Sequence, residues 1–210
     1  MRTIVEGPDR PAESSFTEKK SEFIAQACHI EGADQAAAFV EGVRLTHPKA
    51  RHVCHCAVWG LPGRLNERMA DDGEPSGTAG KPILEVLRRR GLTDCVVTVT
   101  RYFGGILLGS GGLIRAYSTA ASQALDRAHT ADLVDCRRFR IELPYADHQP
   151  FRRLLASCQG RLTDETFTDH VTLIYDLPLS NLDAFESRLS DLVQGRAAKT
   201  DMGPSSILSA

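Results

Sequence analysis

The order of patterned segments after Asp132 is the feature that most restricts the fold of this chain. A strand pattern at residues 136–143 is followed by a helix pattern, a pair of strands that turn at Thr168-Asp169, a second helix pattern and a last strand at 196–201. Asp147 and Asn181 are the expected N-caps of the two helices. The order βαββαβ is the split-βαβ plan of a ferredoxin-like domain. We therefore expect a ferredoxin-like C-terminal domain at residues 135–210.

Residues 1–134 have a different order of segments and form the expected N-terminal domain. Asp34 is the expected N-cap of its first helix, Pro82 can occupy the first turn of its second helix, and Gly91 can end that helix. Residues 61–81 are expected to form a long ordered loop, and the first fifteen and last eight residues to be loose ends. Strand patterns occupy residues 15–30, 52–60 and 95–100, and helix patterns occupy 34–45, 82–90 and a long segment from 113. The whole chain is thus expected to be an α+β protein of two domains.

Composition narrows the classes of partner. With 42% hydrophobic and 25% charged residues the chain can bury an ordinary globular core. Its formal net charge of −2 provides no overall attraction to nucleic acid, so RNA binding would need a local basic patch. No leader-like stretch or apolar run of membrane-spanning length is visible, and the six cysteines do not form a dense framework. We expect a cytoplasmic protein with free thiols and no membrane partner.

Residues 71–81 form the first candidate site. Carboxylates are followed by hydroxyls, glycines and a lysine at the beginning of a helix, a composition that suits either a hard cation such as Mg²⁺ or a phosphate. It is not a Walker A loop, because Pro75 and Pro82 occupy positions that need Gly and Ser or Thr. A solvated turn with capping residues is the alternative. The candidate binding residues are Asp71, Asp72, Glu74, Ser76, Thr78 and Lys81.

Residues 101–117 form the second candidate site, a glycine-rich turn between a strand and a long helix. Glycines at this junction allow close approach of a ligand, and the helix N-terminus favours an anion. Two arginines flank the turn and suit phosphate, while two aromatic residues can stack on bases. The alternative places the aromatic rings in the core. The candidates are Arg101, Tyr102, Phe103, Gly104, Gly105, Gly109, Ser110, Gly111, Gly112, Arg115 and Tyr117.

The strand segment His52-Val53-Cys54-His55-Cys56 resembles a metal site only in composition. Alternate residues of a strand share one face, so His52, Cys54 and Cys56 would extend over about 13 Å, whereas zinc holds its ligands at about 2.0–2.3 Å. No residue marks one of the thiols as a nucleophile. We therefore expect no metal, no cofactor and no catalytic residue, and keep His52 as a binding candidate.

Together, the runs 71–84 and 101–117, the strand Lys20-Ser21-Glu22-Phe23-Ile24 and the strand at His52 resemble the signature of the YigZ/IMPACT family. The resemblance implies an N-terminal domain similar to the second domain of a small-subunit ribosomal protein and to domain IV of elongation factor G. It implies a C-terminal domain similar to domain V of that factor. The eukaryotic branch of the family regulates translation initiation through a different partner domain, which this chain lacks.

The sequence leaves three hypotheses open. The leading one is a non-enzymatic RNA- or ribosome-associated protein, such as a translation regulator, in which Lys81, Arg101 and Arg115 contact phosphates. The second is a Mg²⁺-dependent phosphotransferase or phosphohydrolase that uses the carboxylates of residues 71–74. The third is a protein-interaction module on the same surface.

Overall fold

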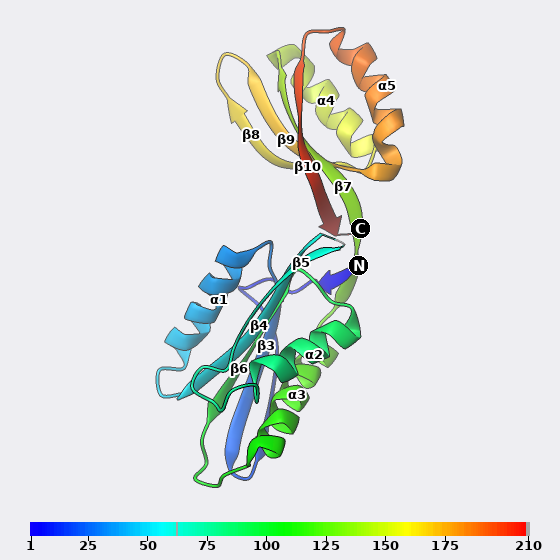
Figure 1. The fold of residues 1–210 in the computed structure, drawn as a ribbon. Helices are drawn as coiled ribbons and strands as arrows, with labels where there is room; N and C mark the ends of the chain where they lie inside the picture. Colours follow the sequence, from blue (N-terminus) through cyan, green and yellow to red (C-terminus); the bar gives the residue numbers. More distant parts are fainter. Residues whose placement is uncertain (62, 209–210) are drawn as a thin grey trace. The chain divides into compact units, whose positions relative to one another are not determined.

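The computed structural model describes residues 1–61 and 63–208, and the chain divides into two compact units, Met1–Asp132 and Leu133–Ala210. Both units are mixtures of helices and strands, as the sequence predicts (Figure 1). Each unit is described by itself. No helix within the described residues has the length and apolar character needed to cross a membrane.

The first unit is built on one antiparallel sheet with the order β2-β3-β6-β4-β5. Helix α1 packs on one face of this sheet, and helices α2 and α3 pack on the other (Figure 1). A short strand, β1, pairs with residues 130–132 at the start of β7. The elements are β1 (Arg2–Ile4), β2 (Ala12–Glu18), β3 (Ser21–His29), α1 (Ala33–Thr46), β4 (His52–Leu61), β5 (Arg64–Ala70), α2 (Gly80–Arg90), β6 (Cys95–Tyr102), α3 (Ser110–Arg127) and β7 (Thr130–Leu143).

The larger core of this unit lies between the sheet and the helices α2 and α3. Alternate residues of β3, such as Phe23, Ala25 and Ala27, are buried on that face. Helix α3 faces them with small side chains, including Ala120 and Ala124, which allow the helix to approach the strands closely. A smaller core lies under α1 on the opposite face.

The second unit confirms the ferredoxin-like expectation. Its strands lie in the order β10-β7-β9-β8, all antiparallel, and helices α4 and α5 pack against each other and against this sheet. The turn between β8 and β9 falls at Thr168, where the sequence places it. The elements after β7 are α4 (Tyr145–Ser157), β8 (Arg161–Phe167), β9 (Val171–Pro178), the 3-10 turn η1 (Leu179–Asn181), α5 (Leu182–Val193) and β10 (Ala198–Leu208).

Several sequence expectations about strands are wrong. Residues 15–30 are not one strand but part of a hairpin, with Lys19 and Lys20 at positive φ in the turn. Two lysines give no turn signal, which is normally Asn-Gly or Asp-Gly. Residues 61–81 contain β5, an edge strand whose residues are almost all exposed and therefore show no apolar alternation. The expected loose ends contain β1, β2 and the last part of β10, which hydrogen bonds of the sheet hold in place.

The expected helix caps also differ from the structure. Asp34 and Asp147 lie inside the first turns of α1 and α4, whose N-caps are Gly32 and Pro144. Asn181 is the N-cap residue of α5, but its amide donates to the carbonyl of Cys158 instead of accepting from the helix. Gly91 does end α2, in the left-handed conformation expected of it.

Candidate functional site

The candidate site begins with one row of side chains across the first sheet. Phe16, Phe23, Arg101 and His52 are direct neighbours on β2, β3, β6 and β4. Directly opposite residues share a face, and this face packs against α2 and α3. The row therefore places a guanidinium and an imidazole on the face that carries the larger apolar core of this unit.

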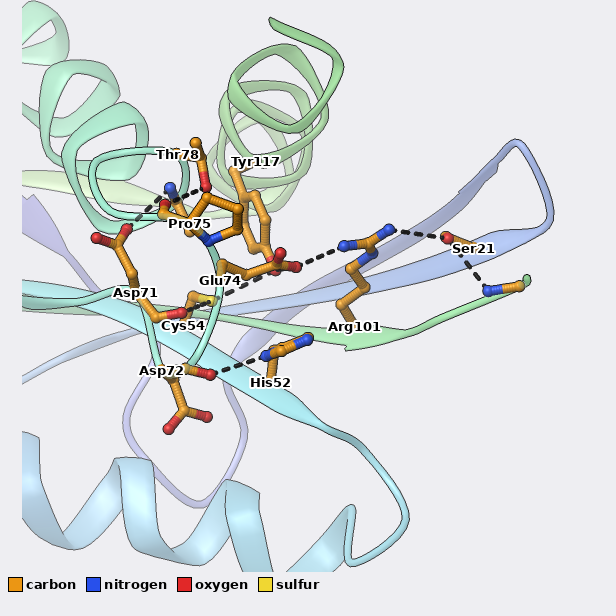
Figure 2. A network of polar contacts seen from close by, with 12 residues as sticks. Ser21, His52, Cys54, Asp71, Asp72, Glu74, Pro75, Thr78, Arg101 and Tyr117 are labelled. Carbon is orange, nitrogen blue, oxygen red and sulfur yellow. Dashed lines mark hydrogen bonds and ion pairs between the residues drawn. The ribbon is translucent and has the colours of Figure 1, made fainter. Parts of the chain in front are cut away.

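Arg101 is held inside the unit by an ion pair with Glu74. Its Nη1 donates to Glu74 Oε1 at 2.6 Å, and both side chains are buried. The hydroxyl of Tyr117, from α3, donates to the same oxygen at 2.8 Å. Arg101 Nη2 donates to Ser21 Oγ, which also accepts the backbone N–H of Gly104 (Figure 2). One carboxylate thus joins the loop before α2 to β6 and α3.

The guanidinium of Arg101 also lies near two aromatic rings. Its central carbon is 5.4 Å from the ring centroid of Phe23 and 5.4 Å from that of Phe103. Phe23 is fully buried, whereas 41% of the surface of Phe103 is exposed. Arg101 Nε has no hydrogen-bond partner among the described residues.

Asp71 closes the N-terminus of α2. Its carboxylate accepts the backbone N–H groups of Gly77, Ala79 and Gly80 at 2.7, 3.0 and 2.8 Å. Burial acts to raise the pKa of Asp71, but these three hydrogen bonds outweigh it and hold the pKa below its ordinary value. The expected alternative of a turn with capping residues therefore describes Asp71.

Asp72 binds a different set of partners. Its carboxylate accepts the N–H of Val53 at 2.6 Å and pairs with Arg44 at 3.0 Å. Burial acts to raise its pKa, but Arg44 and the N–H of Val53 lower it below the ordinary value. The carbonyl of Asp72 is 2.8 Å from His52 Nδ1 (Figure 2). Because a carbonyl can only accept, Nδ1 is the donor in this contact, and Nε2 forms no hydrogen bond within the described residues.

A pocket of about 340 Å³ lies beside this network. Four apolar side chains of the β6–α3 junction form part of its wall, namely Phe103, Leu107, Leu108 and Leu113. Arg51, His52, Glu74 and Arg101 line it as well. Gly109 and Ser110 place the N-terminus of α3 in the same pocket, and Gly109, the N-cap residue, has no side chain with which to cap the helix. The pocket therefore combines apolar walls with the positive end of a helix.

The exposed cations predicted from the sequence lie outside the buried network. Arg115 is exposed on α3, and a Cβ added at Gly111 would be 3.8 Å from its guanidinium, so its side chain lies along the first turn. Lys81 is exposed in the first turn of α2. Neither residue forms a hydrogen bond or ion pair within the described part of the chain, whereas Arg101 is already paired.

Other predicted residues of the 71–81 run do not reach the pocket. Ser76 is exposed in the loop, and the hydroxyl of Thr78 donates to the carbonyl of Pro75 at 2.6 Å.

Tyr102 is half-buried, and its hydroxyl contacts His47 at 2.9 Å at the end of α1, on the opposite face from Arg101. Tyr102 therefore lies away from the pocket and Phe103 lines it, and base stacking by either ring stays a prediction.

The glycines of the junction serve different purposes. Gly104 packs against the β2–β3 turn so closely that an added Cβ would lie 1.9 Å from the carbonyl oxygen of Lys20. Gly105 and Gly109 have φ of 85° and 74°, which favours glycine. Gly111 and Gly112 lie in the first turn of α3.

Among residues 1–61 and 63–208 no three His, Cys, Asp or Glu side chains gather as a metal site. Burial raises the pKa of the Cys54 and Cys56 thiols to about 12, so both are protonated at neutral pH. The sequence did not make Arg51 a binding candidate, and it gave Ser21, Leu107 and Leu108 only within the family signature. Cross-strand neighbours and loop geometry bring these residues to the site.

The comparisons with known proteins define the class of this protein. Residues 19–125 match the Impact N-terminal domain, and residues 141–196 match a domain of unknown function, DUF1949. The chain belongs to the IMPACT family, which confirms the resemblance seen in the sequence.

Relatives match most of the chain. The IMPACT family member YigZ of Escherichia coli is 38% identical over 84% of this chain and 87% of its own length. The family member YvyE of Bacillus subtilis is 34% identical over 85% of this chain and 82% of its own length. A crystal structure described as that of a hypothetical protein is 34% identical, with a TM-score of 0.72, and the match covers 94% of this chain and 95% of that one.

Proposed function

We propose that this protein is a non-enzymatic RNA- or ribosome-associated protein with a role in the control of translation, which binds phosphate groups at the junction between β6 and α3. The observation that carries the proposal is the uncapped N-terminus of α3, an 18-residue helix, together with the exposed Arg51 and Arg115. A helix N-terminus attracts anions through its free N–H groups and its dipole, and arginine forks suit phosphate.

Two observations favour RNA over other polyanions. Because the net charge is −2, attraction to a polyanion must come from a local patch, and this patch adjoins an exposed aromatic ring that can stack on a base. The resemblance of the family to domains of elongation factor G and of a ribosomal protein indicates the same class of partner.

In this proposal the exposed cations and the buried arginine have separate tasks. Arg51, Arg115 and Lys81 are accessible to phosphates. Arg101 is paired with Glu74 and Ser21, so we assign it to the support of Phe103 and the pocket wall. Of the predicted phosphate contacts, Lys81 and Arg115 are therefore retained, and Arg51 is added.

The hypothesis of a Mg²⁺-dependent enzyme has no comparable support, because Asp71, Asp72 and Glu74 all accept hydrogen bonds from the protein itself. One observation does favour a protein-interaction module. Apolar side chains near the pocket are exposed, with Leu107 exposed over 81% of its surface and Ile106 and Ile114 each over 42%. The following experiment separates this alternative from RNA binding.

The test is binding of a fluorescent single-stranded RNA, followed by anisotropy across about 50 to 200 mM salt. The variants are Arg51→Ala/Arg115→Ala and the control Arg89→Ala. Arg89 is exposed near the C-terminal end of α2. The next residue, Arg90, contacts Ser122 and Asp126 in the last turns of α3, so this end of α2 lies away from the N-terminus of α3. Arg101 is left unchanged, because removing one partner of a buried ion pair typically costs about 3–5 kcal/mol.

We expect the wild type and Arg89→Ala to bind with the same steep log–log salt slope. The double variant should bind more weakly, with a slope reduced in magnitude by about 1.4, since each lost phosphate contact on a single strand contributes about 0.7. Absence of RNA binding at 50 mM salt, or equal slopes in all three proteins, would overturn the proposal and favour the protein-interaction module.

A further inference from the structure

We infer that the pocket beside Phe103 receives a single unstacked nucleotide of the bound RNA, with its base on the Phe103 ring and its phosphate at the N-terminus of α3. This inference rests on the proposed RNA binding and names the chemical group that the site recognises.

The size and lining of the pocket fit such an occupant. Its volume of about 340 Å³ lies near the lower end of the range for small-molecule sites, about 300–1,000 Å³. Phe103, Leu107 and Leu108 give it an apolar wall for the faces of a base. Gly109 and Ser110, at the start of α3, provide a place for an anion in the same pocket. A base linked to a phosphate has both kinds of surface.

Phe103 is built as a stacking platform. The Arg101 guanidinium lies 5.4 Å from its ring centroid, and Arg101 is only 5% exposed and is held by Glu74 and Ser21. The ring therefore rests on a fixed support, while 41% of the residue remains exposed to an incoming base. Because the ring is already held in place, stacking a base on it costs little side-chain entropy.

The pocket wall also has a polar side. His52 lines the pocket, and its Nδ1 contacts the Asp72 carbonyl, so Nε2 is the ring nitrogen without a hydrogen bond among the described residues. The edge of a base carries both donors and acceptors, so it offers a partner to this nitrogen.

The surroundings favour a nucleotide within a chain over a free one. Arg51 lies at the pocket and Arg115 along the first turn of α3, and both are exposed and unpaired within the described residues. These cations can contact the phosphates that precede and follow the inserted nucleotide. Free adenosine monophosphate shares the chemistry of the pocket contact and is therefore a separate arm of the test.

The test uses a single-stranded oligouridine that contains one 2-aminopurine, whose fluorescence reports unstacking and insertion, with anisotropy as the measure of total binding. Phe103→Leu removes the aromatic ring and keeps an apolar side chain, and Phe103→Trp keeps the stacking surface. The matched control is Phe167→Leu, which removes an exposed phenylalanine of the second unit. Adenosine monophosphate is titrated against the same four proteins.

We expect the wild type, Phe103→Trp and Phe167→Leu to give the 2-aminopurine signal. Phe103→Leu should lose the signal and bind about tenfold more weakly, with an unchanged salt slope because its phosphate contacts remain. Salt-sensitive RNA binding without a Phe103-dependent signal would overturn the inference and leave the proposed function standing. Absence of any RNA binding would overturn both, and so would Phe103-dependent binding of adenosine monophosphate alone.

Discussion

At the scale of single residues, the carboxylates of the 71–74 segment organise the candidate site by binding groups of the protein itself. Glu74 anchors Arg101 and Tyr117, Asp72 anchors β4 through Val53, and Asp71 closes the start of α2. Charge-assisted hydrogen bonds of this kind are stronger than neutral ones, and inside a protein they hold loops in one conformation. The 71–74 segment therefore holds α2, α3, β4 and β6 together beside the pocket.

The hydrogen bonds of the Asp71 carboxylate lead us to expect that stability depends on pH. The folded-state pKa of Asp71 lies below its ordinary value, so the stabilisation that Asp71 provides is fully present above the unfolded-state pKa, about 3.9, and is lost as the pH falls through the folded-state pKa. We expect Asp71→Asn to lower the free energy of unfolding at pH 7 by about 1–2 kcal/mol, the size of a helix-cap effect. Urea unfolding between pH 7 and pH 2.5 would measure this.

At low pH the unfolding free energies of the wild type and Asp71→Asn should converge. Protonation of Asp71 removes from the wild type the charged hydrogen bonds that the variant lacks already. The matched control is Asp9→Asn, at an exposed aspartate without hydrogen bonds in the described part of the chain, whose curve should run parallel to that of the wild type. A constant difference between wild type and Asp71→Asn at every pH would contradict the assignment.

At the scale of elements, the β2–β3 hairpin supports the β6–α3 junction. Ser21, at the start of β3, accepts hydrogen bonds from Arg101 and from the N–H of Gly104, and the backbone of Lys20 lies directly against Gly104. The junction that carries Phe103 is thus held by an element far from it in the sequence. A change in this packing should reach the pocket.

Gly104→Ala tests this support. A Cβ at this position would lie 1.9 Å from the Lys20 carbonyl oxygen, which is backbone and cannot move by itself. We expect the unfolding free energy to decrease by about 1–3 kcal/mol, as in other overpacked sites, and RNA affinity to fall with it. Thermal and urea unfolding would measure the first effect, and anisotropy the second.

Gly42→Ala provides the comparison for that substitution. Gly42 lies within α1, and an added Cβ there meets no atom within 4 Å. Its replacement should stabilise the protein by about 0.5–1 kcal/mol through helix propensity and leave RNA binding unchanged. Equal effects of the two substitutions would show that Gly104 has no packing role.

At the scale of the whole molecule, the chain has separate hydrophobic cores in its two units. Phe151 is fully buried in the second, where its ring contacts those of Tyr175 and Phe185 at centroid distances of 5.2 and 5.9 Å. Leu87 is fully buried in the first. Because a cavity weakens mainly the contacts around it, each core should respond to its own mutation.

We expect Phe151→Ala to destabilise the second unit by about 3–5 kcal/mol and to increase amide hydrogen exchange mainly in residues 133–208. Leu87→Ala should increase exchange mainly in the first unit, at a cost of about 2–5 kcal/mol. Hydrogen-exchange mass spectrometry of the full chain would separate the two patterns. Equal increases in both units after either substitution would mean that they unfold as one.

Much of the architecture follows from the sequence because it depends on local patterns. The βαββαβ order, the helix end at Gly91 and the alanine-rich face of α3 are all consequences of residue periodicity and backbone preference. Glu74, Arg101 and Phe103, which are candidates from the sequence, line the pocket in the structure. The sequence did not predict β5, because an exposed edge strand carries no alternation of apolar and polar residues.

The sequence by itself determined the helices of the chain and the βαββαβ order of the second unit, because periodicity is a local property of the chain. Only the tertiary structure decided which groups the site residues contact. The pairing of β6 with β3 and β4 put Arg101 beside Phe23 and His52, and the loop before α2 brought Glu74 to the same guanidinium. A predicted phosphate ligand became a buried support, since a charge takes its role from the neighbours that long-range pairing provides.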